Sequence, residues 1–496
     1  MSDAPPRPEA RSPRGFADKR ADTLRAERRL LEAVSAVYER YGFEALDTGA
    51  FEYADALGKF LPDADRPNAG VFALQDDPEA EGGGEWMALR YDLTAPLARF
   101  VAQNWEGLPK PFRRYAMGAV WRNEKPGPGR FREFVQCDAD TVGSARPEAD
   151  AEIVAMAAEG LEAAGLARGA YVLKVNNRKL LNGLLCAAGV LDDGQKLGVL
   201  RAVDKLDRLG PDGVRLLLGE GRKDESGAFT KGAGLQAKAA ESVLAFVAAA
   251  GETRASTLAK LADVIGGSAE GDAGLEELAR IDAALKGMGV AEDQARFDPS
   301  VVRGLEYYTG AVFEAELLMQ TTDDRGQKVN FGSIGGGGRY DDLVARFTGQ
   351  PVPATGFSFG VSRLAAALRA AGVEEDRGPR GPVVVIAFDE DGMDDYFRAV
   401  SELRAVGIAA EVYLGASGMR AQMKYADRRL APAAVILGGD ERANGQVTIK
   451  DLDLGRALSS GVDGNEAWRA ERPGQVTVAR DQLTPVVRAI IEAGSR

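Results

Sequence analysis

The chain has 496 residues, of which 45% are hydrophobic and 28% are charged. These values are ordinary for globular proteins and exclude a disordered or fibrous chain, and the length predicts roughly two to four domains. The net charge of −13 counts against nucleic-acid binding when taken alone. Local basic faces of a multidomain protein can nevertheless hold an RNA while the remaining surface stays acidic.

Membrane and metal signals are weak throughout the sequence. It has no run of about 18 apolar residues, and its polar, Pro- and Arg-rich start lacks the apolar centre of a signal peptide. We therefore expect a cytoplasmic protein with no membrane segment. Cys137 and Cys186 are the two cysteines and form no C-x-x-C motif, so we expect neither a disulfide framework nor a metal held by protein side chains.

The first third of the chain predicts one long helix and several strands. Residues 21–40 have the spacing of an amphipathic helix, whose apolar stripe we assign to Leu24, Leu31, Val34 and Val37. A short strand follows at 42–46. Residues 71–75 and 86–91 predict a hairpin around an acidic, Gly-rich loop, and residues 115–122 and 131–139 predict a longer antiparallel pair.

The middle of the chain changes from mixed to helical character and back. A helix at 148–164 and a strand at 171–175 precede an Ala-, Leu- and Lys-rich stretch, from about 181 to 290, which predicts a helical insertion. Strand patterns return at 310–318 and 330–334. They are followed by the glycine run Gly335–Gly338 and by a helix at 341–347.

A charged Gly/Pro linker at 372–381 precedes a segment in which strands and helices alternate. Strands are expected at 383–388, 409–414 and 433–437, with helices at 394–406 and 418–430. Such alternation predicts a separate α/β domain with a mostly parallel sheet.

Three groups of residues could carry chemistry. Arg122 and Arg130 flank a polar loop and could clamp a polyphosphate, while a phenylalanine on the adjacent strand offers a stacking face. For either arginine alone, a solvated hairpin with surface ion pairs is the commoner explanation. The second group, 303–310, has a charged residue beside Tyr307 and Tyr308, which point to opposite faces of a strand. For this group alone, an ordinary strand start with a half-buried tyrosine is the favoured explanation.

The third group is the glycine run, followed by the pattern 356–363. Consecutive glycines let the backbone approach a ligand, and a helix beginning there would direct its positive end at it. A flexible turn is the simpler alternative, and the spacing of a phosphate-binding P-loop is absent.

Together these groups resemble a known family. Three features resemble motifs 1, 2 and 3 of class II aminoacyl-tRNA synthetases. They are, in that order, the helix followed by a strand around Gly42, the strand pair with Arg122, and the Gly-rich pattern ending in Arg363. Residues 303–310 and 336–341 resemble the two peptides particular to histidyl-tRNA synthetases, and Arg14, Gly15 and Asp18 resemble that family's start.

The resemblance implies an α/β multidomain fold and a domain division. We expect an N-terminal tail (1–20), a class II catalytic domain on an antiparallel sheet with the helical insertion (21–372), and a C-terminal α/β anticodon-binding domain (382–496). The implied enzyme is a histidine–tRNA ligase of class IIa. Its implied partners are L-histidine, ATP with Mg²⁺, tRNA(His) and a second copy of the chain as a homodimer.

The resemblance also implies roles for individual residues. Arg122 would hold the α-phosphate and Arg130 the outer phosphates, Phe134 and Arg363 would sandwich adenine, and Arg303 would act on the α-phosphate. Glu124 would also contact ATP. The implied contacts to histidine are Asp92, Thr94, Gln136, Asp140, Tyr307, Tyr308, Gly336 and Gly338. The implied contacts to tRNA are Arg420, Lys424 and Arg428. Asp92 and Thr94 match positions for the α-amino group, and Asp140 and Tyr308 match positions facing the imidazole. Arg420, Lys424 and Arg428 share one face of a helix. In an isolated helix, such a basic face is more often merely solvated.

The sequence departs from the family pattern at Gly49, Val135, Asn177 and Ser362. Gly49 stands in place of a motif 1 proline, and Ser362 stands where motif 3 often has an acid. Alternative assignments are a non-catalytic relative, such as the regulatory subunit of ATP phosphoribosyltransferase or a starvation-sensing domain, and a class II synthetase for threonine, proline or glycine. The retained arginines and the two histidine-specific peptides disfavour both.

Overall fold

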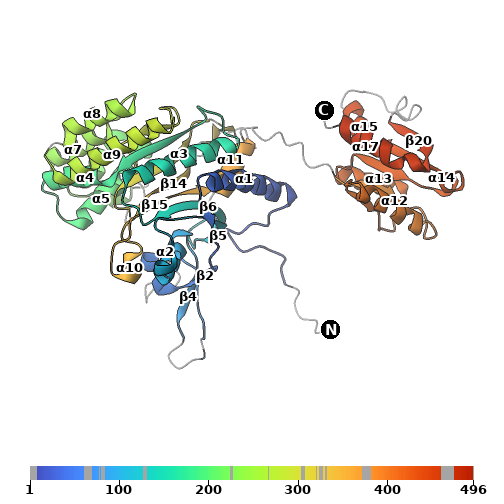
Figure 1. Cartoon of the computed structure of the whole chain (residues 1–496), viewed down its shortest axis with the longest axis horizontal. Coiled ribbons are helices and arrows are strands. Elements are labelled where there is room, and N and C mark those ends of the chain that lie inside the picture. The colour runs from blue at the N-terminus through green and yellow to red at the C-terminus, as the bar shows by residue number, and fades with distance from the viewer. Residues whose placement is uncertain are drawn as a thin grey trace. The chain divides into compact units, whose positions relative to one another are not determined.

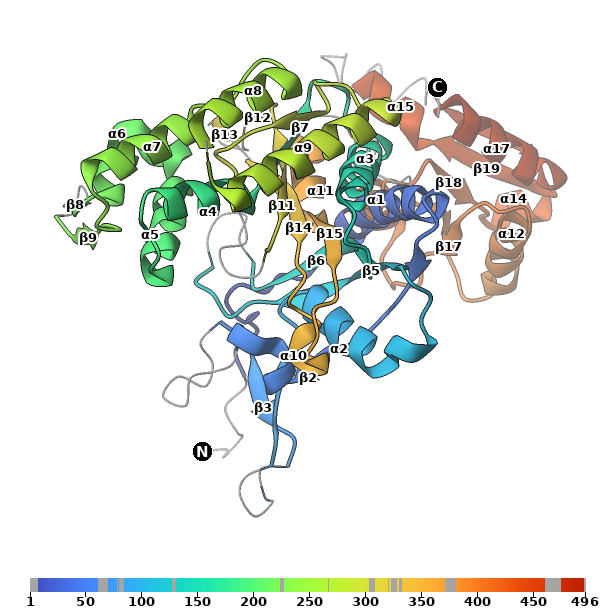
Figure 2. The same cartoon turned by 60° about the vertical axis from the view of Figure 1, so that its left-hand side comes forward.

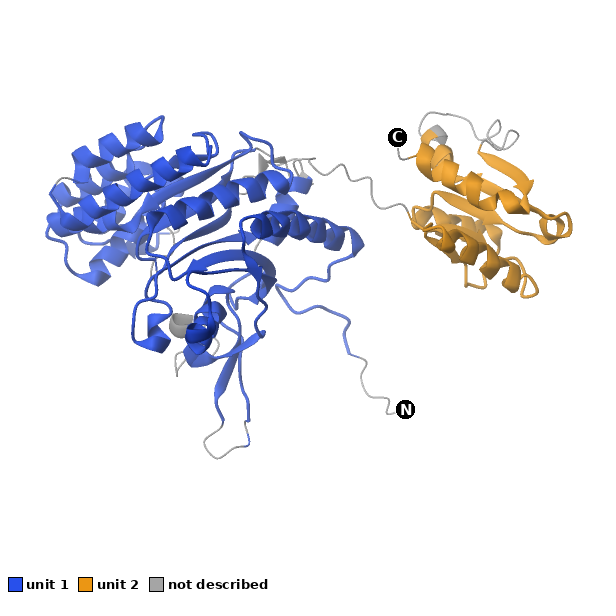
Figure 3. Ribbon diagram, in the orientation of Figure 1, with its two compact units in different colours: residues 1–375 blue, residues 376–496 orange. Residues whose placement is uncertain are grey.

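The computed structural model describes residues 8–60, 70–77, 79, 84–126, 131–223, 227–265, 267–302, 308–319, 321–322, 328–329, 332–370, 381–459 and 474–494. The chain divides into two compact units, residues 1–375 and 376–496, which Figure 3 colours separately. Among the described helices, none is long and apolar enough to cross a membrane.

The first unit is organised around one large sheet. Its strand order within the described residues is β1-β5-β6-β15-β14-β11-β7-β10. Neighbours from β5 to β7 pair antiparallel, whereas the two edge pairs, β1 with β5 and β10 with β7, are parallel. The strands are β1 Glu44–Ala45, β5 Phe112–Trp121, β6 Glu133–Val142, β7 Tyr171–Asn177, β10 Ala295–Phe297, β11 Ala311–Leu317, β14 Ser333–Arg339 and β15 Ala354–Gly360. This antiparallel core confirms the expected fold class.

Helices cover one face of this sheet, as Figures 1 and 2 show for α1, α3 and α11. Cys137 and Ala139 of β6 and Phe357 and Phe359 of β15 point to that side and are buried in the largest apolar core. The helices of this unit outside the insertion are α1 Ala21–Arg40, α2 Thr94–Asn104, α3 Pro147–Ala163, α10 Ala345–Thr348 and α11 Val361–Ala370, with 3₁₀ turns η1 Ala54–Phe60 and η2 Trp105–Gly107.

Helix α1 has the predicted bounds, but its predicted stripe is partly wrong. Leu24 is exposed at 38%, whereas Leu30, Val34, Val37 and Tyr38 are buried against the sheet. The reason is that the helix begins beyond the edge of the core, so that its first turn has no apolar neighbour to cover it.

The predicted helical insertion is present between β7 and β10. Its helices are α4 Arg178–Ala187, α5 Asp193–Val203, α6 Leu206–Leu218, α7 Ala237–Val247, α8 Arg254–Ile265 and α9 Ala269–Gly287. A small hairpin, which the sequence patterns did not predict, joins β8 Gly221–Lys223 to β9 Phe229–Lys231. A second hairpin pairs β12 Thr321–Thr322 with β13 Lys328–Val329.

The predicted hairpin near the N-terminus belongs to a three-stranded sheet. Its order is β2-β4-β3, with β2 Phe51–Tyr53, β3 Ala73–Gln75 and β4 Trp86–Leu89 all antiparallel. Glu52 and Ala88 face inward and are buried. Phe51, Tyr53 and Leu74 lie on the opposite face and are more than 40% exposed.

The glycine run lies inside strand β14, so the alternative of a flexible turn is wrong, and the helix expected at 341–347 begins later. Gly335 to Gly338 each pair with residues of β15, and the helix that follows is the four-residue α10, beginning at Ala345. No helix N-terminus therefore follows the run directly. The strand forms because neighbours on both sides satisfy its backbone hydrogen bonds, which offsets the poor strand propensity of glycine.

The second unit has the expected α/β architecture. Three strands, β16 Val383–Ile386, β17 Ala410–Val412 and β18 Ala433–Ile436, pair in parallel, and β19 Gln446–Asp451 and β20 Gln475–Ala479 extend the sheet antiparallel. The helices are α12 Met393–Ala405, α13 Met419–Arg428, α14 Gly439–Ala443, α15 Leu452–Ser459 and α17 Leu483–Ala493, with the 3₁₀ turn η3 Arg480–Gln482.

Candidate active site

Strand β6 carries a row of polar and aromatic side chains on the face opposite the covering helices. Phe134, Gln136, Asp138 and Asp140 alternate with the core-facing residues, so all four share that face. Over these positions the strand extends about 20 Å at about 3.4 Å per residue. One strand can therefore line a site long enough for an amino acid joined to a nucleotide.

Neighbouring strands supply a floor of small residues on the same face. Gly356 and Ser358 of β15 lie opposite Asp140 and Asp138, and Gly338 and Gly336 of β14 come next across the sheet. A Cβ on Gly356 would collide with the Asp140 carboxylate, and one on Gly338 would lie 3.0 Å from Cδ1 of Tyr308. These glycines thus make room for Asp140 and Tyr308, two residues expected at the histidine pocket.

Asp140 is held by two buried neighbours. Arg114 Nη2 of β5 lies 3.1 Å from Asp140 Oδ2, and the Tyr340 hydroxyl donates to Oδ1. Arg114, which is fully buried, also donates to the Leu93 carbonyl oxygen at 2.8 Å. Burial raises the pKa of Asp140, the Arg114 guanidinium and the Tyr340 hydrogen bond lower it, and the charge of Asp92 raises it further.

Asp92 and Thr94 lie at the start of α2. Asp92 Oδ1 accepts the backbone N–H groups of Thr94 (3.1 Å) and Ala95 (2.9 Å), which fixes the carboxylate at the helix N-terminus. Helix α2 itself packs on Phe112 and Val142, which belong to the site's face of the sheet. The helix therefore covers one end of this face and brings Asp92 to its border.

Arg122 lies between two aromatic rings at the far end of the row. Its guanidinium carbon is 4.3 Å from the Tyr91 ring centroid and 5.1 Å from that of Phe134. The Tyr91 hydroxyl donates to Glu124 Oε1 at 2.8 Å, and burial, opposed by Arg122, raises the pKa of Tyr91 to about 12. Arg122, Glu124 and Phe134, which the sequence placed in one arginine-rich hairpin, thus form one cluster around Tyr91.

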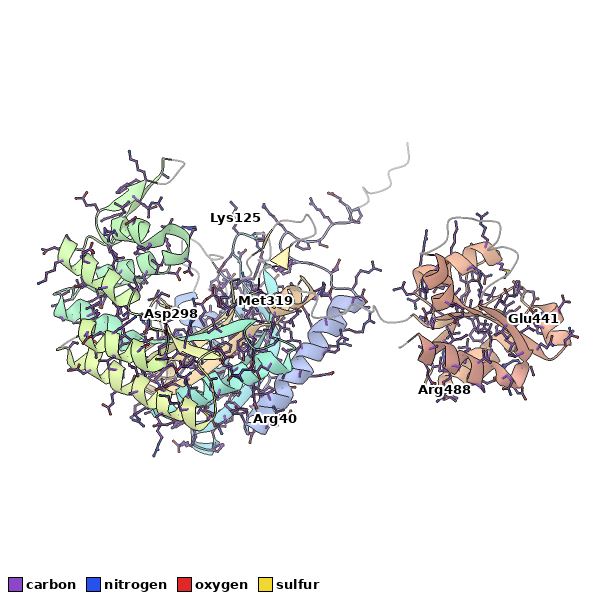
Figure 4. All side chains as sticks on the ribbon, turned by 90° about the horizontal axis from the view of Figure 1, so that it is seen from above. Arg40, Lys125, Asp298, Met319, Glu441 and Arg488 are labelled. Carbon is purple, nitrogen blue, oxygen red and sulfur yellow. The ribbon has the colours of Figure 1, made fainter. Side chains whose placement is uncertain are left out.

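Arg363 reaches the neighbouring strand from the first turn of α11. Its Nη1 donates to the Ser333 carbonyl oxygen at 2.7 Å, and its side chain is exposed. Arg130, Arg303 and Tyr307 lie outside the described residues. The described chain stops at Pro126, next to Lys125, which Figure 4 labels, and resumes at Phe131.

The segment that leads to Arg303 is anchored on β7. The Asn176 side-chain amide donates to the carbonyl oxygens of Pro299 (3.1 Å) and Val301 (2.9 Å) from a buried position. The neighbouring Asn177 donates to Glu277 of the insertion at 2.7 Å. Asn176 therefore fixes the chain before Arg303 to the sheet. Asn177 links the same strand to α9.

Comparisons with known proteins agree with this geometry. A family model described as histidyl-tRNA synthetase matches residues 15–364, and one described as anticodon binding domain matches residues 382–488. A protein of Caulobacter vibrioides named histidine–tRNA ligase is 76% identical over 98% of this chain and 97% of its own length. The chain belongs to the histidyl-tRNA synthetase family. It is thus an aminoacyl-tRNA synthetase, a ligase that joins histidine to its tRNA at the expense of ATP.

Other relatives of this histidyl-tRNA synthetase family cover the whole chain as well. A histidine–tRNA ligase of Brucella suis is 56% identical over 100% of this chain and 99% of its own length. The solved histidyl-tRNA synthetase of Nostoc has a TM-score of 0.70 at 28% identity, covering 97% of this chain and 100% of that one. A Bacillus halodurans protein titled ATP phosphoribosyltransferase regulatory subunit/histidyl-tRNA synthetase (21% identity, 84% and 96% coverage, TM-score 0.65) shares the fold alone.

Sequence reasoning missed Asp138, which lies between Gln136 and Asp140 on the same face. It is 1% exposed, and burial raises its pKa to about 7, opposed by Arg114 and by a Ser358 hydrogen bond. The two-residue period along β6 was the signal that could have identified it. No sequence period predicts the contacts of Arg114 and Tyr340 with Asp140, because these contacts depend on the fold.

The three basic residues of the second unit that were expected to contact tRNA lie on the helix that the sequence predicted. Arg420, Lys424 and Arg428 occupy α13 and are all exposed. Among the described residues, no ion pair connects them to an acidic side chain. Their charge is therefore available to a polyanion.

Proposed function

We propose that histidine and ATP react on the face of β6 opposite the covering helices, with histidine near Asp140 and the nucleotide near Phe134. The observation that carries this proposal is the shared face of Phe134, Gln136, Asp138 and Asp140, which links the aromatic–arginine cluster to the buried carboxylates. A carboxylate acceptor in a buried pocket suits an imidazole N–H, because an amino acid without that group would leave the acceptor unpaired.

The chemistry requires positioning and positive charge. An oxygen of the histidine carboxylate bonds to the α-phosphorus of ATP, the bond to the β-phosphate oxygen breaks, and pyrophosphate leaves. A hydroxyl of the terminal tRNA ribose then attacks the acyl carbon, loses its proton, and AMP leaves. The carboxylate is already ionised at neutral pH, so the first step needs no histidine base, and the chain contains no histidine.

Arginines supply the positive charge in this proposal. Arg122 would contact the α-phosphate, since its guanidinium is held on two aromatic rings beside the expected adenine face. Arg130 for the outer phosphates, Arg303 for the α-phosphate and Tyr307 beside the histidine rest on the family resemblance. Mg²⁺ would arrive on the ATP phosphates and be held mainly by them and water. In the described part of the chain no cluster of three or more acidic or thiol groups forms a separate ion site.

We also propose that the enzyme works in the cytoplasm as a homodimer. The outer face of the β2-β4-β3 sheet exposes Phe51, Tyr53 and Leu74, which a second copy would cover. Light scattering should give twice the chain mass. A Phe51→Glu/Tyr53→Glu variant should give the monomer mass, and an unchanged mass would exclude this face as the contact.

ATP–pyrophosphate exchange tests the proposed reaction. The purified chain should exchange label in the presence of histidine and not with threonine, proline or glycine. Arg303→Ala should slow the exchange greatly while ATP binding is retained. Exchange driven by another amino acid would refute the proposed substrate, and an unchanged rate in Arg303→Ala would remove that arginine from the reaction.

A further inference from the structure

A part-buried polar network joins the N-terminal segment to the direct neighbours of the two residues that would sandwich adenine. Lys19 Nζ lies 2.9 and 2.8 Å from the two carboxylate oxygens of Glu27, a residue of α1 that is 5% exposed. The Ser362 hydroxyl donates to Glu27 Oε1 at 2.9 Å, and Lys19 Nζ is 3.4 Å from Ser362 Oγ. The carboxylate therefore has partners on both oxygens despite its burial.

Ser362 continues the sheet where a strand ends. The pairing of β15 with β6 ends at Gly360 and Gln136. The next backbone N–H of β6 on that side, from Val135, donates to Ser362 Oγ at 3.5 Å. The side chain of Ser362 therefore takes the place of the missing strand carbonyl and connects the first turn of α11 to β6.

The two residues that this link connects are the direct neighbours of the expected adenine contacts. Val135 follows Phe134, and Ser362 precedes Arg363. Phe134 points to the site's face, whereas Val135 packs against the core under the helices. The hydrogen bond between Ser362 and Val135 therefore links the two residues that adjoin Phe134 and Arg363.

The N-terminal segment before Lys19 also contacts the first unit next to β6. The Arg132 backbone N–H donates to the Gly15 carbonyl oxygen at 2.8 Å, and the Phe16 ring lies 5.7 Å from that of Phe72. Gly15 adopts φ +88°, and a Cβ there would lie 2.9 Å from the Arg132 side chain. The segment from Gly15 to Lys19 thus runs from the Arg132 end of β6 to the start of α11.

We propose that Lys19, Glu27 and Ser362 are positioning residues that set the spacing of the adenine sandwich between Phe134 and Arg363. In this chain the acid comes from α1, while the position before Arg363 contributes a hydroxyl. The inference rests on the proposed function, because it assumes that ATP binds between these two residues. It assigns a role in nucleotide affinity to a segment that does not itself contact the nucleotide.

The proposal is tested with variants that remove the contacts among Lys19, Glu27 and Ser362 without leaving an unpaired charge buried. Ser362→Ala removes the hydroxyl, and Lys19→Met/Glu27→Met replaces both charged partners with apolar groups of similar length. Ser362→Thr keeps the hydroxyl. Leu30→Ala is the matched control, because Leu30 is a buried core residue of α1 outside the network.

Histidine-dependent ATP–pyrophosphate exchange gives KM for ATP and for histidine, and thermal unfolding gives Tm. Ser362→Ala and the double variant should raise KM for ATP roughly five-fold, the effect of one hydrogen bond, and leave KM for histidine within about two-fold. Ser362→Thr should retain the wild-type value. Leu30→Ala should lower Tm without changing KM for ATP.

An unchanged KM for ATP in Ser362→Ala would overturn the proposal. It would equally be overturned if Leu30→Ala raised KM for ATP as much as Ser362→Ala, because general destabilisation would then explain the effect. Absence of histidine-dependent exchange in the wild-type chain would instead refute the proposed function, so the two failures are distinguishable.

Discussion

Arg114 of β5 and Asp140 of β6 form an ion pair with no access to solvent, with Arg114 Nη2 3.1 Å from Asp140 Oδ2. Removing one charge of such a pair leaves the other buried and uncompensated, which costs about 3–5 kcal/mol. Asp140→Asn should therefore lower the free energy of unfolding by that amount and raise KM for histidine far more than KM for ATP. Urea unfolding and exchange kinetics measure the two effects.

An exposed pair gives the comparison for Asp140. Arg280 and Glu148 are about equally exposed and 2.7 Å apart, so Glu148→Gln should cost less than about 1 kcal/mol and leave both KM values unchanged. Equal losses of stability in the two variants would contradict the buried pairing of Asp140.

Asp138 should make stability depend on pH. Burial raises its pKa to about 7, whereas an Asp carboxyl in an unfolded chain has a pKa of about 3.9. Between these values the folded state holds the proton and the unfolded chain does not, so the free energy of unfolding should fall as pH rises from about 4 to 7. Asp138→Asn should reduce this slope, as measured by urea unfolding at a series of pH values.

Part of the slope should remain in Asp138→Asn, because burial also raises the pKa of Asp150, to about 6. Asp150 lies in α3, where Arg339 contacts it. An identical slope in Asp138→Asn and the wild type would show that Asp138 does not hold a proton near neutral pH in the folded state.

Much of this site was predictable because strands and helices impose regular periods. Residues 115–139 predicted the β5–β6 pair, and its alternation would have identified Asp138 with Gln136 and Asp140. The glycine run was not predicted as a strand, because local preference cannot show that strands on both sides satisfy its backbone. Arg114 with Asp140, and Glu27 with Ser362, were not predictable, since 335 residues separate Glu27 from Ser362 and only the fold brings them together.

Arg122 should contribute to the reaction step through its planar, charged guanidinium, which a lysine cannot replace. Arg122→Lys keeps a cation but loses the planar guanidinium that lies over Tyr91 and Phe134. We expect Arg122→Ala to reduce kcat/KM for ATP in the exchange reaction roughly 100-fold, as loss of one donor to a developing anion does, and Arg122→Lys to restore little of it.

Lys125, a neighbouring exposed cation, gives the control for this comparison. Lys125→Ala should change kcat/KM for ATP less than about three-fold, because an exposed surface charge adds little. A wild-type rate in Arg122→Ala would contradict the assigned phosphate contact.

The stripe on α13 should affect tRNA and leave amino acid activation unchanged. Replacing Arg420, Lys424 and Arg428 by Gln should weaken tRNA binding and lower the slope of log affinity against log salt by roughly 2, at about 0.7 to 0.9 per phosphate contact. Histidine-dependent exchange should be unaltered. Filter binding at several salt concentrations measures the slope.

Arg398→Gln on α12, which removes an exposed arginine paired with Asp395, is the matched control and should leave the slope unchanged. If the triple variant bound tRNA with wild-type affinity and slope, α13 would not be the contact with the anticodon arm.

The most direct measurement is the charging of tRNA(His) by the purified chain with ATP and labelled histidine. The account predicts histidine-specific label at the 3′ end of the tRNA, lost in Asp140→Asn and retained in Glu148→Gln. Absence of charging with histidine, or charging with another amino acid in its place, would contradict it.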